Sequence, residues 1–220
     1  MLSRATAELI RSALESAGVS LSPSQAIATE AYFGLLTKWS NLLNLTGFSL
    51  DSPSRESVNR LLVEPFLAAR TVATVGNGAR LVDVGSGGGS PAVPLAIGTP
   101  AISLTMVESR ERKAAFLREV IREVGLVNAS VECARAEKLA EDPLHRGRAD
   151  VVSIRAVRLN AAMSNAIAGL LAPHGRVLWF QPTNDRLADS SLRDLRHERS
   201  ESLGADARLD ILVRAAHRQL

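Results

Sequence analysis

The chain has 220 residues, of which 46% are hydrophobic, and a formal net charge of +3, which excludes a disordered or membrane-embedded chain and leaves room for an ample core. The single cysteine, Cys133, excludes a disulfide framework and fits a reducing compartment. Charged residues interrupt the apolar pattern of the N-terminal stretch, so it is not a signal peptide, and we expect a cytoplasmic protein with no membrane partner.

The first 75 residues contain three segments in which apolar residues recur at helical spacing. The expected helices cover 3–17, 22–43 and a segment that starts at 51. The second should include Ile27 and Tyr32 in its buried stripe. Three helices before the first strand predict an N-terminal helical cap over 1–75, followed by a larger domain over 76–220. One continuous domain is the alternative.

From Arg80 onward, strand patterns alternate with helix patterns. The expected strands are 80–84, 102–107, 127–133, 150–154, 175–180, 196–203 and 208–215. The expected helices are one that starts at Pro91, one over 109–124, a short one that ends at Leu139, and two over 159–171 and 185–195. This alternation predicts an α/β fold in which helices flank a mainly parallel, seven-stranded sheet.

The stretch Leu81–Pro91 combines a short buried strand, a glycine turn and a proline suited to the first turn of a helix. This is the nucleotide-binding opening of a Rossmann-like fold, with the ligand at the carboxyl end of the strand. Two cofactors compete for it. A dinucleotide fingerprint, G-x-G-x-x-G/A, fits residues 87–92, whereas D-x-G-x-G, with which S-adenosylmethionine sites usually begin, fits residues 83–87.

The charge beside the loop distinguishes between these two cofactors. A pyrophosphate needs backbone N–H groups and a helix N-terminus without an anion beside it, so the carboxylate of Asp83 would repel it. The same carboxylate suits the ammonium group of a methionine moiety. We therefore expect S-adenosylmethionine, bound by Asp83 and by the glycine loop. The loop residues expected to take part are Gly85, Ser86, Gly87 and Gly89.

Acidic residues after the next two strands are further candidates for the cofactor site. Glu108 lies 19 residues beyond Gly89, and a carboxylate at that place accepts hydrogen bonds from both ribose hydroxyls. Ala136 and Glu137 follow the third strand, where the adenine end of the cofactor would lie. Glu137 equally fits the first turn of a short helix, where the helix dipole favours an acid.

Arg155 follows the fourth strand, at the place where the transferred methyl group should emerge towards the substrate. Other basic residues surround the same strand, and such a cluster would neutralise RNA phosphates. The candidates for contact with RNA are Arg146, Arg148 and Arg158. A solvated loop face is the alternative for the first two.

The sequence also narrows the reaction. No Asn/Asp-Pro-Pro-Tyr/Phe motif follows the fourth strand, which disfavours methylation of an exocyclic amine. Cys133 falls inside the third predicted strand, so we expect a core residue rather than a nucleophile. A ring nitrogen such as guanine N7 carries its own lone pair and needs only alignment with the methyl–sulfur bond. The absence of a catalytic base is therefore compatible with activity.

Several segments resemble the glucose-inhibited division protein B (RsmG) family, which methylates guanine N7 in bacterial 16S ribosomal RNA. They are Trp39–Thr46 (family W-N-x-x-x-N-L-T), Asp83–Ile97 (D-x-G-S/T-G-x-G-x-P-G-x-P-L-A-I), Glu108–Leu117 (E-S-x-x-K-K-x-x-F-L), Arg135–Glu137 (R-A-E) and Arg155–Val157 (R-A). The resemblance covers nearly the whole chain. It implies a class I methyltransferase fold, S-adenosylmethionine as cofactor and the small ribosomal subunit as partner, and we expect a monomer.

The resemblance also assigns residues. It implies a cofactor site made of Asp83, Gly85, Gly87, Glu108, Ser109, Ala136, Glu137 and Arg155. Arg155 would in addition face the substrate, as the candidate catalytic residue. No metal site is implied.

The substrate side departs from the family pattern. The family's R-H-x-x-D-S is here Arg60–Pro65, with Leu61 in place of the histidine, and Ser90–Ala92 replaces Phe-Pro-Gly. The Lys-Gly that follows the fifth strand is Gln181-Pro182. Methylation of guanine N7 remains the leading interpretation. A cofactor-binding paralogue with another substrate or weakened catalysis, and a non-catalytic RNA-binding or ribosome assembly factor, are the alternatives.

Overall fold

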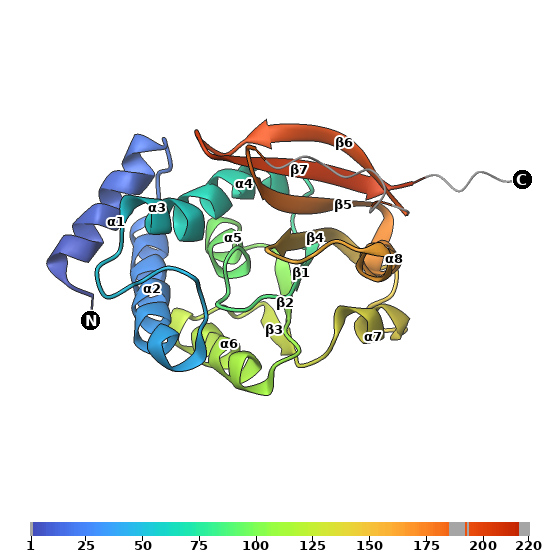
Figure 1. The fold of residues 1–220 in the computed structure, drawn as a ribbon, viewed down its shortest axis with the longest axis horizontal. Helices are drawn as coiled ribbons and strands as arrows, with labels where there is room; N and C mark the ends of the chain where they lie inside the picture. The colour runs from blue at the N-terminus through green and yellow to red at the C-terminus, as the bar shows by residue number, and fades with distance from the viewer. Residues whose placement is uncertain (1, 185–191, 193, 216–220) are drawn as a thin grey trace, which may run out of the picture.

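A seven-stranded sheet forms the centre of the computed structural model, which describes residues 2–184, 192 and 194–215. The strands are β1 (Arg80–Val84), β2 (Ser103–Val107), β3 (Ala129–Glu132), β4 (Ala149–Arg155), β5 (Leu171–Pro182), β6 (Leu195–Ser202) and β7 (Ala207–Arg214). Their order in the sheet is β3-β2-β1-β4-β5-β7-β6 (Figure 1). The first five strands are parallel and β7 pairs antiparallel with β5 and β6, which confirms the predicted mainly parallel sheet.

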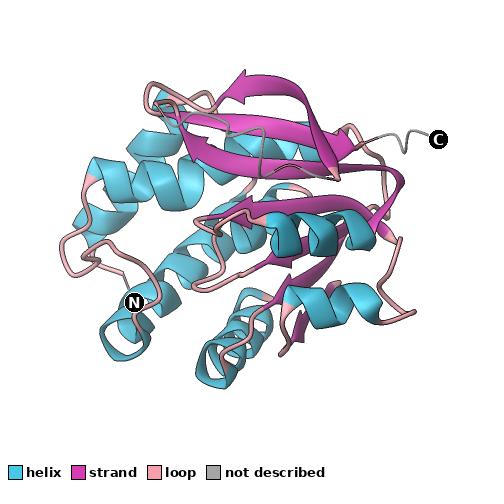
Figure 2. Ribbon diagram, turned by 45° about the vertical axis from the view of Figure 1, so that its right-hand side comes forward, coloured by secondary structure: helices cyan, strands magenta, loops and turns pink. Residues whose placement is uncertain are grey.

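Helices cover both faces of this sheet (Figure 2). They are α1 (Arg4–Ser16), α2 (Pro23–Leu43), α3 (Arg55–Val58), the π-helix η1 (Asn59–Val63), α4 (Glu64–Ala73), α5 (Ala92–Gly98), α6 (Glu111–Val124), α7 (Ala136–Glu141) and α8 (Ala161–Leu170). Successive strand residues point to opposite faces. Leu81 therefore joins the buried cluster on the side of α1 to α6, and Val82 joins the cluster formed with α7 and α8.

The helix boundaries follow from local chemistry. Ser22 caps α2 in a reciprocal capping box with Gln25, as its Ser-Pro start signal suggests. The helix ends where Asn44 adopts the left-handed conformation, with φ of 48°. Gly125 ends α6 in the same way, with φ of 75°. Because Leu45 to Phe48 follow directly after Asn44, this stop delivers them to the carboxyl edge of the sheet, where they line a pocket.

The N-terminal helices share their core with the sheet. Ile10, Phe33 and Leu62 belong to the same buried cluster as Leu81 and Met106. Figure 1 shows α2 lying alongside α5 and α6, so the helical segment is packed against the strand–helix units that follow it. Within the described part of the chain, no helix is both long and apolar enough to cross a membrane.

Three local predictions need correction, and a fourth is tested only near its C-terminal end. Cys133 is exposed because β3 is an edge strand that already ends at Glu132. Ile27 is 71% exposed because the buried face of α2 passes through Thr29 and Tyr32 instead. The third predicted helix contains a π turn between α3 and α4. Of the helix predicted over 185–195, residues 185–191 and 193 lie outside the described residues, and Leu195 begins β6.

Candidate cofactor and substrate pocket

In the glycine loop after β1, neighbouring groups leave no room for a Cβ at Gly85 or Gly88. Gly85 has φ of +74°, and a Cβ there would lie 2.9 Å from Cγ2 of Val157. At Gly88 a Cβ would lie 2.9 Å from the carbonyl oxygen of Leu45. The fully buried hydroxyl of Tyr32 donates to the carbonyl oxygen of Gly88 at 2.9 Å. The loop is therefore fixed by α2 and by the segment that follows it.

Asp83 lies beneath this loop and is only 1% exposed. Its Oδ1 accepts a hydrogen bond from the Ser153 hydroxyl at 2.5 Å. Its Oδ2 is buried and has no hydrogen-bond partner among the described residues. Burial raises the pKa of the Asp83 carboxyl to about 6, although the hydrogen bonds from Ser153 and Ser86 lower it. A buried carboxylate oxygen without a donor is costly, so this atom marks a place where a cation would be stabilised.

Glu108 is the second buried carboxylate beside the loop, and it is 7% exposed. Its Oε2 accepts from the backbone N–H of Gly87 at 3.0 Å, and its Oε1 accepts from that of Arg110 at 2.8 Å. An ionised carboxylate has about four acceptor sites. Each oxygen of Glu108 therefore keeps one lone pair for a further donor, which is what a pair of ribose hydroxyls would need.

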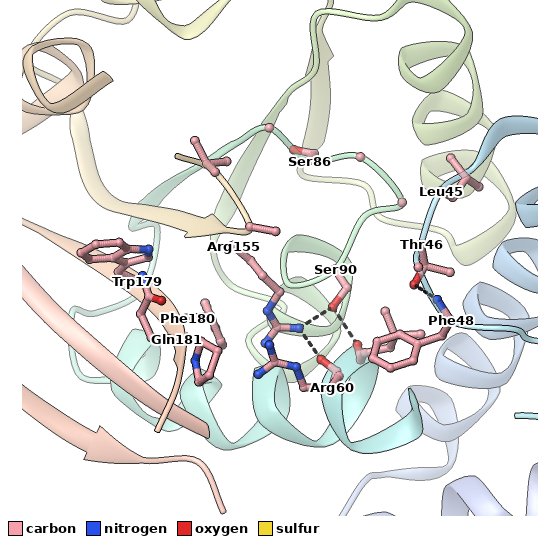
Figure 3. Close-up of a pocket in the computed structure, with 18 of the residues that line it drawn as sticks. Leu45, Thr46, Phe48, Arg60, Ser86, Ser90, Arg155, Trp179, Phe180 and Gln181 are labelled. Atoms are coloured by element: carbon pink, nitrogen blue, oxygen red, sulfur yellow. Dashed lines mark hydrogen bonds between the residues drawn. The ribbon is translucent and has the colours of Figure 1, made fainter. Parts of the chain in front are cut away.

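A pocket of about 900 Å³ opens between the carboxyl ends of the parallel strands and the segment after α2 (Figure 3). Its volume lies within the range of small-molecule sites. Its lining includes the glycine loop, Phe48, Trp179 and Phe180. The charged residues that line it are Arg60, Arg155 and Arg158, and no carboxylate of the described residues does. The pocket is thus cationic and partly aromatic.

The guanidinium of Arg155 is held through both of its terminal nitrogens and through one face. Nη2 donates to Oε2 of Glu64 at 2.9 Å. Nη1 donates to the Ser90 hydroxyl at 3.2 Å and to the carbonyl oxygen of Arg60 (Figure 3). The guanidinium carbon also lies 4.4 Å from the centre of the Phe180 ring. Burial lowers the pKa of Arg155 to about 10, against the attraction of Glu64, so the side chain stays charged at neutral pH.

Pro65 and the π turn before it leave backbone carbonyls free to accept these hydrogen bonds. In the π register the Glu64 N–H donates to the carbonyl of Asn59. Pro65 has no N–H, so it cannot donate to a carbonyl one turn earlier. The carbonyls of Arg60 and Leu61 are instead used by Arg155 and by the Ser90 hydroxyl, the latter at 2.9 Å. The freed backbone acceptors therefore join the helical segment to the glycine loop.

The structure brings part of the predicted site together. The predicted residues that line the pocket are Gly85, Ser86, Gly87, Arg155 and Arg158. Four residues that depart from the family pattern line it as well, namely Leu61, Ser90, Gln181 and Pro182. Asp83 and Glu108 are buried against the loop, and Gly89 is buried within it. Ser109 is exposed after β2, and Ala136 and Glu137 form the first turn of α7, outside the pocket lining.

The basic cluster predicted around β4 is wrong as a single cluster. Arg146 and Arg148 precede the strand, whereas Arg155 ends it and Arg158 follows it. A strand of 7 residues separates its two ends by roughly 20 Å. Arg158 therefore belongs to the pocket, and the exposed Arg146 and Arg148 lie at the opposite edge of the sheet.

Sequence reasoning assigned no site role to several residues that line or support the pocket. Phe48, Trp179 and Phe180 were not considered, and Arg60 and Ser90 entered only as parts of the compared family motifs. Tyr32 and Glu64 support the lining. A proline one residue after a glutamate inside a helical pattern was the available signal for the π turn. Nothing local to Glu64 indicates that its partner is Arg155, which lies 91 residues away.

Comparison with known proteins gives a consistent result. Residues 25–191 match the family GidB, rRNA small subunit methyltransferase G. The chain is 36% identical over 174 residues to ribosomal RNA small subunit methyltransferase G of Cupriavidus necator, which covers 77% of this chain and 73% of that one. It is 48% identical over 111 residues to the protein of the same name from Xylella fastidiosa, which covers 50% and 49%.

Solved structures agree at the level of the fold. A SAM dependent methyltransferase from Aquifex aeolicus superposes with a TM-score of 0.53 over 74% of this chain and 94% of that one. The two sequences are 16% identical, so this likeness shows the fold alone. The fold is that of class I methyltransferases, as the family resemblance implied.

Proposed function

Because the chain belongs to the rRNA small subunit methyltransferase G (GidB) family, we propose that it transfers a methyl group from S-adenosylmethionine to guanine N7 of 16S ribosomal RNA. The observation that carries this proposal is the unpartnered, buried Oδ2 of Asp83 at the end of β1, beside the glycine loop. An ammonium group placed there offsets the cost of the buried charge. A pyrophosphate would meet repulsion instead.

The residues present fit this cofactor. Asp83 and the loop from Gly85 would hold its methionine end, and the spare lone pairs of Glu108 would accept from its ribose. Ala136 and Glu137 would lie at its adenine end. When bound, S-adenosylmethionine supplies an electrophilic methyl group on a sulfonium. One side of the glycine loop is closed by α2 and by the Leu45 carbonyl, so the cofactor would meet the loop from the other side.

The chemical task left to the protein is alignment of the substrate. The N7 lone pair of guanine attacks without prior deprotonation, so no general base is needed. The described pocket lining contains no carboxylate. It contains no histidine either, and Leu61 stands where the family has one. Phe48 and Trp179 offer apolar surface against which a base can be held. Losing the family's lysine at Gln181 should slow the reaction rather than abolish it.

Two measurements test this proposal. Calorimetric titration with S-adenosylmethionine and with NAD should show binding of the first only, and the double variant Asp83→Ala, Glu108→Ala should abolish it. Labelled methyl groups should then pass to undermethylated small ribosomal subunits and map to N7-methylguanine. Binding of NAD but not S-adenosylmethionine would overturn the cofactor assignment. Tight binding without transfer to RNA, also in Gln181→Lys, would favour the catalytically weakened paralogue.

The remaining details extend the same proposal. The ribosomal substrate would place the enzyme in the cytoplasm, where we propose that it acts as a monomer. Sedimentation of the purified protein at micromolar concentration checks the oligomeric state, and a dimer would contradict it.

A further inference from the structure

We propose that Arg60, together with Arg158, binds a backbone phosphate of the RNA at the rim of the pocket, and that Arg155 is a positioning residue. This inference rests on the proposed function, because it names the group that receives the substrate in the same pocket. By contrast, the position of Arg155 at the end of β4 suggests that Arg155 itself contacts the substrate.

Few hydrogen-bond donors of Arg155 remain available to a substrate. Its two terminal nitrogens already donate to Glu64, Ser90 and the backbone of Arg60, and its side chain is 11% exposed. Its flat face covers Phe180. Its remaining Nε is buried and meets no acceptor among the described residues. Arg155 therefore joins η1 and α4 to β4 and β5, and so shapes the wall of the pocket.

Arg60 is held much more loosely. Its side chain is 28% exposed, and only Nη1 reaches Glu64, at 3.4 Å from each carboxylate oxygen. Strong charge-assisted hydrogen bonds are about 2.7–2.9 Å long, a length that Glu64 reaches only with Arg155. The Nε and Nη2 atoms of Arg60 make no hydrogen bond with any residue that the structure describes. They remain available for an anion.

The local charge balance points the same way. Arg60 and Arg155 share the single buried carboxylate of Glu64, and the exposed side chain of Arg158 has no ion pair within the described residues. Asp83 and Glu108 lie behind the glycine loop and are assigned to the cofactor, whereas Glu56 and Asp206 line the adjoining groove and not the pocket. On its pocket side, the rim therefore carries uncompensated positive charge.

The position of Arg60 selects phosphate as the anion. Arg60 and Pro182 line both the pocket and an adjoining groove of about 810 Å³ between the run from α3 to α4 and the β6–β7 turn. The Arg60 side chain thus lies where two hollows meet. The groove is also lined by Glu56 and Asp206, so a phosphate would be held on the pocket side of Arg60. A nucleotide whose base enters the pocket would pass its sugar–phosphate backbone over this rim. A guanidinium presents parallel N–H groups that match phosphate oxygens, which makes arginine the suited residue.

The test measures binding of a 16S ribosomal RNA fragment over a salt series, using the full-length protein. The variants are Arg60→Gln, Arg60→Lys, Arg158→Gln and Arg155→Gln, with Arg122→Gln on α6 as the matched control. Arg122 is exposed, and its ion pairs within the described residues are with acids of its own helix. Arg60→Gln should weaken RNA binding roughly ten- to a hundredfold. The salt slope should fall by about one unit for each lost phosphate contact.

The other readouts separate the roles. Arg60→Lys should restore part of the affinity, Arg158→Gln should lower the salt slope, and Arg122→Gln should change neither. Arg155→Gln should lower the unfolding temperature but keep the wild-type salt slope. Calorimetry should give an unchanged affinity of Arg60→Gln for S-adenosylmethionine.

Two results would overturn the inference. One is a wild-type salt slope and RNA affinity in Arg60→Gln. The other is a reduced slope in Arg155→Gln with none in Arg60→Gln. Failure of the proposed function has a different signature, which is wild-type protein that transfers no methyl group to small ribosomal subunits. RNA binding still reports on Arg60 in that case, so the two failures are distinguishable.

Discussion

Asp83 and the glycines next to it determine most of the chemistry of the pocket at the scale of single residues. Asp83 combines nearly complete burial with an oxygen that has no partner in the described structure. A buried carboxylate oxygen without a partner lowers the stability of the folded protein, and a bound cation would relieve that cost. Gly85 shows a related constraint, because both its φ of +74° and the nearby Val157 exclude a side chain. These two residues support one prediction each.

The first prediction concerns pH. The folded pKa of Asp83, about 6, is raised above its ordinary value of 3.8, so the folded state binds the proton more tightly than the unfolded state. The wild-type free energy of unfolding should therefore fall as the pH rises from 4 to 7, by up to about 3 kcal/mol from this group. Asp83→Asn removes this contribution. Urea unfolding of both proteins should show the variant gaining stability relative to wild type over that range.

The same titration should appear in ligand binding. Wild-type affinity for S-adenosylmethionine should weaken as the pH falls below about 6, since the carboxylate that attracts the ammonium becomes protonated. Parallel stability curves for wild type and Asp83→Asn between pH 4 and pH 7 would contradict the assignment.

The second prediction uses a matched pair of glycines. Gly85 and Gly125 have nearly the same φ, +74° and +75°, but a Cβ at Gly125 would meet nothing within 4 Å. Gly125→Ala should cost about 1–2 kcal/mol from backbone strain alone. Gly85→Ala should cost roughly 1–3 kcal/mol more, because Val157 must move. Denaturant unfolding gives both values, and calorimetry should show binding of S-adenosylmethionine lost only in Gly85→Ala. Equal losses of stability with binding kept in both would refute the steric argument.

At the scale of secondary structure, the run from α3 through η1 to α4 is the element that links the helical segment to the sheet. Its π turn and Pro65 leave the carbonyls of Arg60 and Leu61 for partners outside the helix. Glu64, on the next turn, completes the link by pairing with Arg155 from β4. Burial raises the pKa of Glu64, whereas Arg155 and Arg60 lower it. The pair is thus a buried connection between two elements.

The third prediction follows from this link. Glu64→Gln leaves the buried guanidinium of Arg155 without a counter-charge, which should cost about 3–5 kcal/mol. Glu8→Gln is the control, because its ion pair with Arg4 is exposed, with side chains 93% and 55% accessible, and should change stability by at most about 1 kcal/mol. Chemical denaturation measures both. A Glu64→Gln protein as stable as Glu8→Gln would show that the link contributes nothing.

At the scale of the whole molecule, the helices before Arg80 and the sheet form one buried cluster. Ile10 and Phe33 share it with Leu104 and Ile211, which come from strands near opposite ends of the sheet. Thr71 on α4 also donates to Glu201 on β6 at 2.6 Å. We therefore propose that 1–75 and 76–220 are one cooperative unit rather than two domains.

The fourth prediction is a single thermal unfolding transition, with equal calorimetric and van't Hoff enthalpies. A fragment covering 76–220 should not fold alone, because removing α1 to α4 exposes the part of the buried cluster that α5 and α6 do not cover. S-adenosylmethionine at about one hundred times its dissociation constant should stabilise the protein by about 2.7 kcal/mol and raise the midpoint by roughly 5–10 °C. Two separate transitions in scanning calorimetry, with only the second shifted by the cofactor, would support the division at residue 75.

The sequence alone determined the features that depend on neighbours a few residues apart. Alternation and helical spacing predicted the seven strands and most of the described helices, and the strand and glycine turn predicted a Rossmann-like α/β fold. Asp83 added the expectation of S-adenosylmethionine as cofactor. The same local segments carried the family resemblance, which the comparison confirmed. Such patterns are set by backbone geometry and periodic burial, so they can be read without knowing how the chain closes.

Only the tertiary structure decided which distant groups meet. Glu64 and Arg155 are 91 residues apart, and their pairing depends on η1 and α4 packing over the end of β4. The length of β4 moved Arg146 away from Arg158, and the early end of β3 exposed Cys133. Arg60 became the candidate for phosphate because Arg155 had already taken the stronger hydrogen bond to Glu64. Competition for one buried carboxylate is a property of the folded chain, since no local pattern records which of two cations lies closer to it.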